Sequence, residues 1–141
     1  MFALTKDNQK IKKYLLFNVV MVCIVALLYF FNNTFFKHLS PLQPLTYFLK
    51  CYFNDLICPF GYLAGLNLIA FFTLKEFRIV DFWRIQLWTL VAGLIWEYVA
   101  PLLKPTSVTD LLDLLCYQAG AVGYYFINRF YVKNILIQEG E

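Results

Sequence analysis

The chain has 141 residues and a net charge of +3, and its composition is 61% hydrophobic, 20% aromatic and only 15% charged. A soluble helical protein could be this apolar only if its helices were buried on all sides, and a chain this short has too little interior for that. The composition therefore excludes an ordinary soluble globule and predicts a single integral membrane domain over residues 1–141.

Four stretches are apolar enough to cross a bilayer, which takes about 20 residues of helix. We expect spans at about residues 14–31, 54–74, 84–103 and 110–130. Between the first two, apolar residues at helical spacing predict a short helix over about 44–53 that lies in the membrane interface. The alternative is that the second span simply starts early. The predicted fold is an all-α bundle of four transmembrane helices with one interfacial helix.

Basic residues gather before the first span, between the second and third spans, and after the fourth. The positive-inside rule assigns these segments to the cytoplasm, so both termini are expected inside and the connections 32–53 and 104–109 outside. We interpret the basic residues as topology signals and as contacts to anionic lipid, with no case for nucleic acid.

Two further patterns concern cysteine, histidine and glycine. The four cysteines show no C-x-x-C spacing and His38 is the only histidine, so we expect free thiols and neither a haem nor a zinc site. Gly61 and Gly65 form a G-x-x-x-G pair in the second span, a pattern that lets another helix approach closely.

Four carboxylates fall near the outward ends of the predicted spans: Asp55, Glu97, Asp110 and Asp113. A carboxylate inside a membrane is costly unless it is paired, hydrated or protonated, so these residues are candidates for function. Glu97 is the strongest, at about 9 Å below the outer end of its span. Ser107-Val108-Thr109-Asp110 has the form of a capping box, whereas Asp113 lies one turn deeper and is predicted to face a pocket. Asp55 is equally suited to capping its span and to binding a ligand.

Three more side chains complete the predicted site. Tyr117 shares a helical face with Asp113, Gln118 follows it, and Lys104 lies beyond Glu97, where it could neutralise the acids or bind an anionic headgroup. The predicted ligand-binding set comprises Glu97, Asp113, Asp55, Asp110, Tyr117, Gln118 and Lys104. Ligands that are all oxygen would suit a divalent cation such as magnesium, the one cofactor considered; no catalytic residue is assigned.

These residues resemble the VanZ-like family of small bacterial membrane proteins over about residues 54–125. The resemblance is carried by Asn54-Asp55 followed by Pro59-Phe60-Gly61, by Trp96-Glu97, and by Asp110-Leu111-Leu112-Asp113 followed by Gly120. The chain departs from that family at Cys58-Pro59, where a histidine is usual, and at Tyr117-Gln118, where an asparagine is common. The resemblance implies a bacterial plasma membrane location, and it transfers no proton-transfer role because the histidine is missing.

The leading functional hypothesis is a small envelope protein whose outward-facing acidic pocket binds a polar headgroup, an amphiphile or a cation. One alternative is a transporter of a divalent cation with an organic acid, which would require oligomers of a four-span chain. Another is an accessory subunit of a larger membrane complex. An enzyme using Glu97 or Asp113 as general acid or base ranks below these, because no nucleophile or metal-ligand cluster accompanies them. The expected partners are the lipid bilayer, an amphiphile, and a membrane protein or a second copy.

Overall fold

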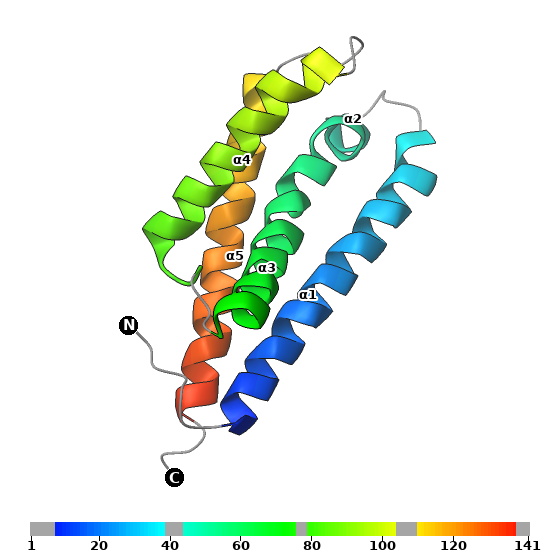
Figure 1. The fold of residues 1–141 in the computed structure, drawn as a ribbon. Coiled ribbons are helices and arrows are strands. Elements are labelled where there is room, and N and C mark those ends of the chain that lie inside the picture. The colour runs from blue at the N-terminus through cyan, green and yellow to red at the C-terminus, as the bar shows by residue number, and fades with distance from the viewer. Residues whose placement is uncertain (1–7, 39–43, 76–78, 104–109, 138–141) are drawn as a thin grey trace.

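The computed structural model describes residues 8–38, 44–75, 79–103 and 110–137, and all regular structure within these ranges is helical. The long helices α1 (Asn8–Thr34), α3 (Phe53–Leu74), α4 (Phe82–Leu103) and α5 (Leu111–Ile137) run alongside one another (Figure 1). A 3₁₀ turn, η1 (Phe36–His38), and the short helix α2 (Pro44–Cys51) lie between α1 and α3. The prediction of an all-α fold is confirmed for the described part of the chain.

Helices α3 and α5 form the centre of the bundle. Helix α5 packs against α3 on one side and α4 on the other, while α1 packs mainly against α3. Helices α1 and α4 therefore occupy the two outer sides, as Figure 1 shows. Because these outer helices share no interface within the described residues, space is left between them over the surface of α3.

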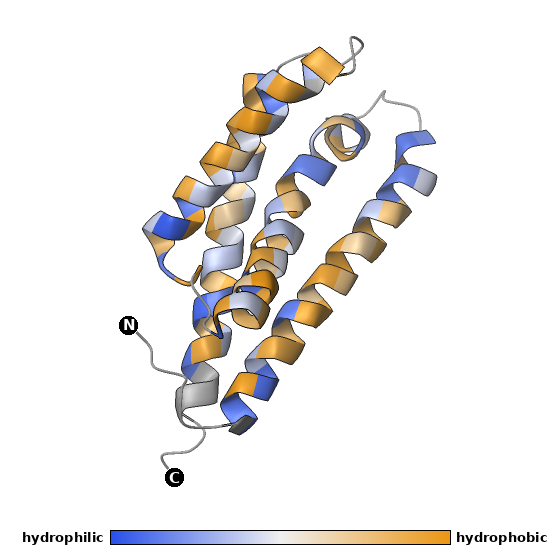
Figure 2. Cartoon of the chain, in the orientation of Figure 1, coloured by the Kyte–Doolittle hydropathy of each residue, from blue (hydrophilic) through white to orange (hydrophobic). Residues whose placement is uncertain are grey.

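Among the described residues, three stretches are long and apolar enough to cross a membrane: Gln9–His38, Phe53–Leu74 and Phe82–Leu103. Large apolar side chains lie on the outer surface, such as Leu27 at 59% and Leu87 at 60% exposure, which suits lipid better than water. Figure 2 shows the apolar middle and polar ends of α1. Helix α5 is not among the candidate spans because its polar residues, tyrosines and glycines lower its mean hydropathy. A crossing by α5 stays a prediction.

Helices α3 and α5 approach each other closely at Gly120. A Cβ atom there would collide with the carbonyl oxygen of Leu56 and lie 3.1 Å from Cγ of Pro59. Of the predicted G-x-x-x-G pair, Gly61 meets a valine of α1, whereas a Cβ at Gly65 would find nothing within 4 Å. Close helix packing therefore depends on Gly120 and Gly61, and Gly65 is not needed for it.

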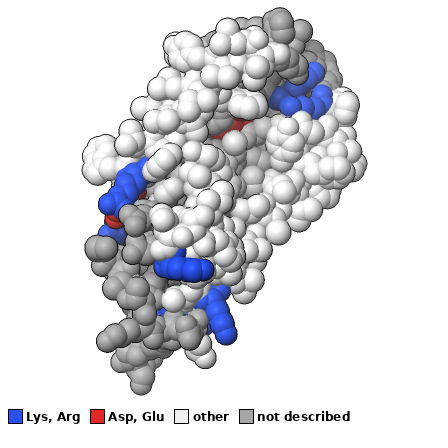
Figure 3. All heavy atoms as spheres, viewed as in Figure 1, with Lys and Arg blue, Asp and Glu red and all other residues white. Residues whose placement is uncertain are grey.

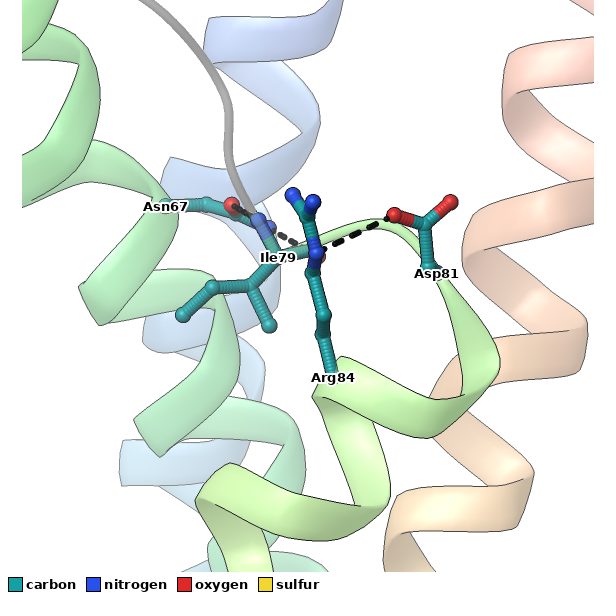
Figure 4. A network of polar contacts seen from close by, with 4 residues as sticks. All are labelled: Asn67, Ile79, Asp81 and Arg84. Atoms are coloured by element: carbon teal, nitrogen blue, oxygen red, sulfur yellow. Dashed lines mark hydrogen bonds and ion pairs between the residues drawn. The ribbon is translucent and has the colours of Figure 1, made fainter. Parts of the chain in front are cut away.

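Buried amides tie the helices together in the half of the bundle where α1 begins. Asn67 of α3 donates from Nδ2 to the carbonyl of Ile79 and accepts the N–H of Ile79 at Oδ1, both at 2.9 Å (Figure 4). Nδ2 of Asn67 also donates to the Tyr124 hydroxyl of α5 at 3.1 Å, and that hydroxyl donates to Asn18 of α1 at 3.4 Å. One chain of hydrogen bonds thus links α1, α5, α3 and the segment that leads into α4.

An ion pair lies at the same junction. Nε of Arg84 is 3.4 Å from Oδ2 of Asp81, and both side chains are more than half exposed (Figure 4). Exposed pairs of this kind contribute only about 0–1 kcal/mol. The buried contacts of Asn67, rather than this ion pair, therefore hold the start of α4 in place.

Candidate ligand-binding site

A cavity of about 850 Å³ lies between α1, α3 and α4, with one residue of α5 in its wall. Pockets that hold small molecules span about 300–1,000 Å³, so this cavity is large enough for a ligand. Much of its wall is apolar and comes from Val22, Val25 and Ala26 of α1 and from Ala92 and Gly93 of α4. Figure 3 shows acidic atoms recessed among uncharged atoms in the upper middle of this face, with basic atoms at the upper right, at the left edge and lower down.

The charged and amide lining residues gather at one end of the cavity. Lys37 comes from η1, and Asn54 and Asp55 come from the first turn of α3. Along α1 the lining continues from Tyr29 to Val22, a distance of about 10 Å at 1.5 Å per residue. The cavity is therefore polar where α3 begins and apolar toward the middle of the bundle.

Asp55 is the one predicted acid among the described lining residues. Its Oδ1 accepts a hydrogen bond of 3.0 Å from the Tyr117 hydroxyl, which joins α3 to α5, and the charges of Glu97 and Lys37 act on it. Helix α3 begins after Tyr52, whose side chain forms no capping hydrogen bond, and Asp55 lies in the first turn of this helix. The capping role and the ligand-binding role of Asp55 both stay predictions. A carboxylate has lone pairs for about four hydrogen bonds, so this one retains acceptors for a ligand.

Asp110 caps α5, the role that its sequence pattern favours. Its Oδ1 accepts the N–H of Leu112 at 2.9 Å, and its Oδ2 accepts a hydrogen bond of 3.4 Å from the Tyr52 hydroxyl. The pKa of Tyr52 lies above its ordinary value, first because of its hydrogen bond with Tyr47 and then because of desolvation. A tyrosine hydroxyl is protonated at neutral pH, so Tyr52 is the donor and the Asp110 carboxylate is the acceptor.

Glu97 lies outside the cavity lining, between α4 and α5, and is only 5% exposed. Its Oε2 accepts the backbone N–H of Asp110 at 3.1 Å, so a side chain of α4 stabilises the first turn of α5. A carboxylate is favourable there because the N–H groups that begin a helix have no partner within it and carry the positive end of its dipole. The observed contact of Glu97 is structural, and a ligand-binding role for it stays a prediction.

We expect Glu97→Leu to lower the free energy of unfolding by about 1–2 kcal/mol, since it removes the acceptor of a partly buried N–H group at the start of α5. Glu97→Gln keeps a side-chain oxygen that can accept the Asp110 N–H, so its loss should be smaller. Heat unfolding in detergent micelles, followed by circular dichroism, measures both. Equal losses in the two variants would contradict the capping role.

The remaining predicted residues either lie near the cavity without lining it or fall outside the described residues. Asp113 is partly buried one turn below Asp110, and the charges of Asp55, Glu97 and Asp110 act on it. Neither Asp113 nor Gln118 is among the lining residues, and Nε2 of Gln118 is buried without a hydrogen-bond partner in the described structure. Lys104 lies outside the described residues. The structure thus brings Asp55 and Tyr117 together at the cavity, and the other acids gather near the start of α5.

Of the predicted site residues that the structure describes, only Asp55 and Tyr117 line the cavity, and the polar lining residues that reasoning from the carboxylates missed include Lys37, Asn54 and Thr89. Thr89 is 3% exposed, and its hydroxyl has no hydrogen-bond partner within the described ranges. A threonine inside a helix commonly bonds a carbonyl of the preceding turn, so an unpaired buried hydroxyl on a cavity wall is unusual. The available signal was its place as a hydroxyl residue in the apolar third span.

Comparison with protein families, with curated proteins and with solved structures finds no match for this chain. The fold of the described residues alone therefore defines its class, which is all-helical there with three candidate membrane-spanning helices. The VanZ-like resemblance, the bacterial plasma membrane and the orientation of the termini stay predictions. All four cysteines are free, as predicted. Among the described residues no three His, Cys, Asp or Glu side chains are placed to hold a metal ion.

Proposed function

We propose that the protein is a membrane-resident binding protein whose cavity holds an amphiphile. The headgroup lies by Lys37 and Asp55, and the apolar chain lies along Val22 and Val25 of α1. The observation that supports this most is the order of polar and apolar lining within one cavity, polar at the start of α3 and apolar toward the bundle centre. An amphiphile in one leaflet of a bilayer also has its polar headgroup at the interface and its apolar chain toward the middle. The ligand can therefore enter the cavity without reversing its orientation.

The arrangement of the helices supports access from the lipid. Helices α1 and α4 do not pack on each other in the described structure, and both expose large apolar side chains. In this proposal α5 is the fourth span, and the end with the acids faces outward. Helix α2 is seen almost end-on in Figure 1, whereas the long helices are seen from the side, so α2 is then the interfacial helix above the polar end.

Filling the cavity tests this proposal. Ala92 lines the cavity, whereas the adjacent Val91 is 40% exposed on the outer surface of α4. We expect Ala92→Phe to reduce the amphiphile retained by the purified protein about tenfold, a loss of about 1.4 kcal/mol in binding. Val91→Phe adds a ring to the same helix outside the cavity, so it should retain the wild-type amount.

Native mass spectrometry of protein extracted gently from its own membrane measures the retained molecule, and heat unfolding confirms that both variants fold. Wild-type protein that carries no amphiphile, or equal retention by folded Ala92→Phe, would refute the proposal. A protein partner retained in fixed ratio, with no amphiphile, would instead favour the accessory-subunit alternative.

A further inference from the structure

We infer, building on the proposed function, that the bound amphiphile has a zwitterionic headgroup. Its ammonium group binds Asp55 and its phosphate group binds Lys37, which makes an aminophospholipid or its single-chain form the ligand class. Three features of the cavity carry this assignment: charges of both signs, acceptors suited to an ammonium group, and a buried hydroxyl below the charged end.

Charges of both signs line the same cavity. Asp55 comes from α3 and Lys37 from η1, and each is partly buried. The charge of Lys37 acts on Asp55, yet no ion pair joins the two within the described contacts. Because a charge shielded from water is costly without a partner, a ligand that satisfies both side chains is favoured over one with a single charge.

The surroundings of Asp55 suit an ammonium group. Tyr117 holds one carboxylate oxygen, which fixes the direction of the carboxylate. The backbone carbonyl of Asp55 lacks its usual helical donor because residue 59 is a proline without an N–H group. An ammonium group has three donors and could use both kinds of oxygen. The rings of Tyr29 and Trp96 also line the cavity and can stabilise a cation through their faces.

The buried hydroxyl of Thr89 points to a third polar group on the ligand. A Cβ added at Gly93 would lie 3.0 Å from the ring of Tyr117, so Gly93 is level with the residue that reaches Asp55. Thr89 lies one turn before Gly93 in α4, about 6 Å toward the apolar end. In a glycerophospholipid the ester carbonyl lies between the phosphate and the chain. Thr89 is therefore placed to donate to that carbonyl oxygen.

The test uses the full chain in detergent micelles and native mass spectrometry to compare three probes of equal chain length. Lysophosphatidylethanolamine carries both charges, lysophosphatidylglycerol carries only the phosphate, and an alkylamine carries only the ammonium. We expect the wild-type protein to bind the first about tenfold more tightly than either of the others.

Each variant removes one part of this preference. Asp55→Asn should bind the zwitterionic and anionic lysolipids equally, and Lys37→Gln should bind the zwitterionic lysolipid no better than the alkylamine. Thr89→Val should weaken the ester-linked probe severalfold without weakening its ether-linked analogue, which has no carbonyl. Asp81→Asn and Lys50→Gln make the same charge changes outside the cavity and should match wild type.

The inference is overturned if the wild-type protein does not prefer the zwitterion, or if folded Asp55→Asn keeps that preference. Amphiphile binding that ignores the headgroup, with Ala92→Phe still defective, leaves the proposed function standing and rejects only the zwitterion. Binding of none of the probes, with no difference between Ala92→Phe and wild type, rejects both. The lipid that co-purifies with the protein when no probe is added identifies the natural ligand. A zwitterionic lipid with one or two chains supports the inference, and an anionic or uncharged lipid refutes it.

Discussion

A methyl group added at Gly120 is expected to lower the free energy of unfolding by about 3 kcal/mol. The new Cβ would collide with the carbonyl oxygen of Leu56 and crowd the ring of Pro59. A carbonyl in a helix cannot rotate away as a flexible side chain can, so α3 and α5 must separate along their contact. Because the hydrogen bond from Tyr117 to Asp55 crosses the same interface, we also expect Gly120→Ala to retain less ligand.

Gly65→Ala is the matched control for this change. It adds the same methyl group to the interior of α3, where nothing lies within 4 Å of the new atom. Alanine is the better helix former by about 0.5–1 kcal/mol, so this variant should be as stable as wild type or slightly more stable. Reversible unfolding in mixed micelles, followed by circular dichroism, compares the two variants. Equal losses of stability in the two variants would show that the collision at Gly120 is not the cause of the destabilisation.

The helices themselves were largely predictable because a run of apolar residues is a local property. The third span, expected at about 84–103, matches α4 (Phe82–Leu103), and the short helix expected at about 44–53 matches α2 (Pro44–Cys51). The first span was expected at about 14–31, whereas α1 covers Asn8–Thr34. Hydropathy marks only the apolar part of a helix, and the polar residues at both ends of α1 continue its hydrogen bonding.

The candidate site was only partly predictable because it depends on how the helices pack. Intramembrane carboxylates could be found from the sequence, and Asp55 and Tyr117, from different spans, do meet at the cavity. The direction of Glu97 could not be predicted, because it follows from α5 lying between α3 and α4. Thr89 was missed because a neutral hydroxyl residue in an apolar span is a weak signal by itself, and its lack of a hydrogen-bond partner is seen only in the structure.

Asn67→Leu is expected to lower the free energy of unfolding by about 3–4 kcal/mol, because each buried polar group left unpaired costs about 1–3 kcal/mol. The variant removes both hydrogen bonds to the backbone of Ile79 and the one to Tyr124. Leucine is similar in size to asparagine, so a cavity is not the main cause of the loss. Heat unfolding in micelles measures the stability, and amide hydrogen exchange at Ile79 measures the local effect.

Tyr124→Phe separates the hydrogen bonds between Asn67 and Ile79 from those that run through the Tyr124 hydroxyl. It removes only the hydroxyl that joins Asn67 to Asn18, so we expect a loss of about 1 kcal/mol and no faster exchange at Ile79. Exchange that stays slow in Asn67→Leu would mean that another contact holds this peptide. If exchange at Ile79 accelerates as expected, the start of α4 is held less firmly. The cavity wall is then affected too, because α4 carries the lining residues Thr89 and Ala92. Asn67→Leu should then also weaken ligand retention, whereas Tyr124→Phe should not.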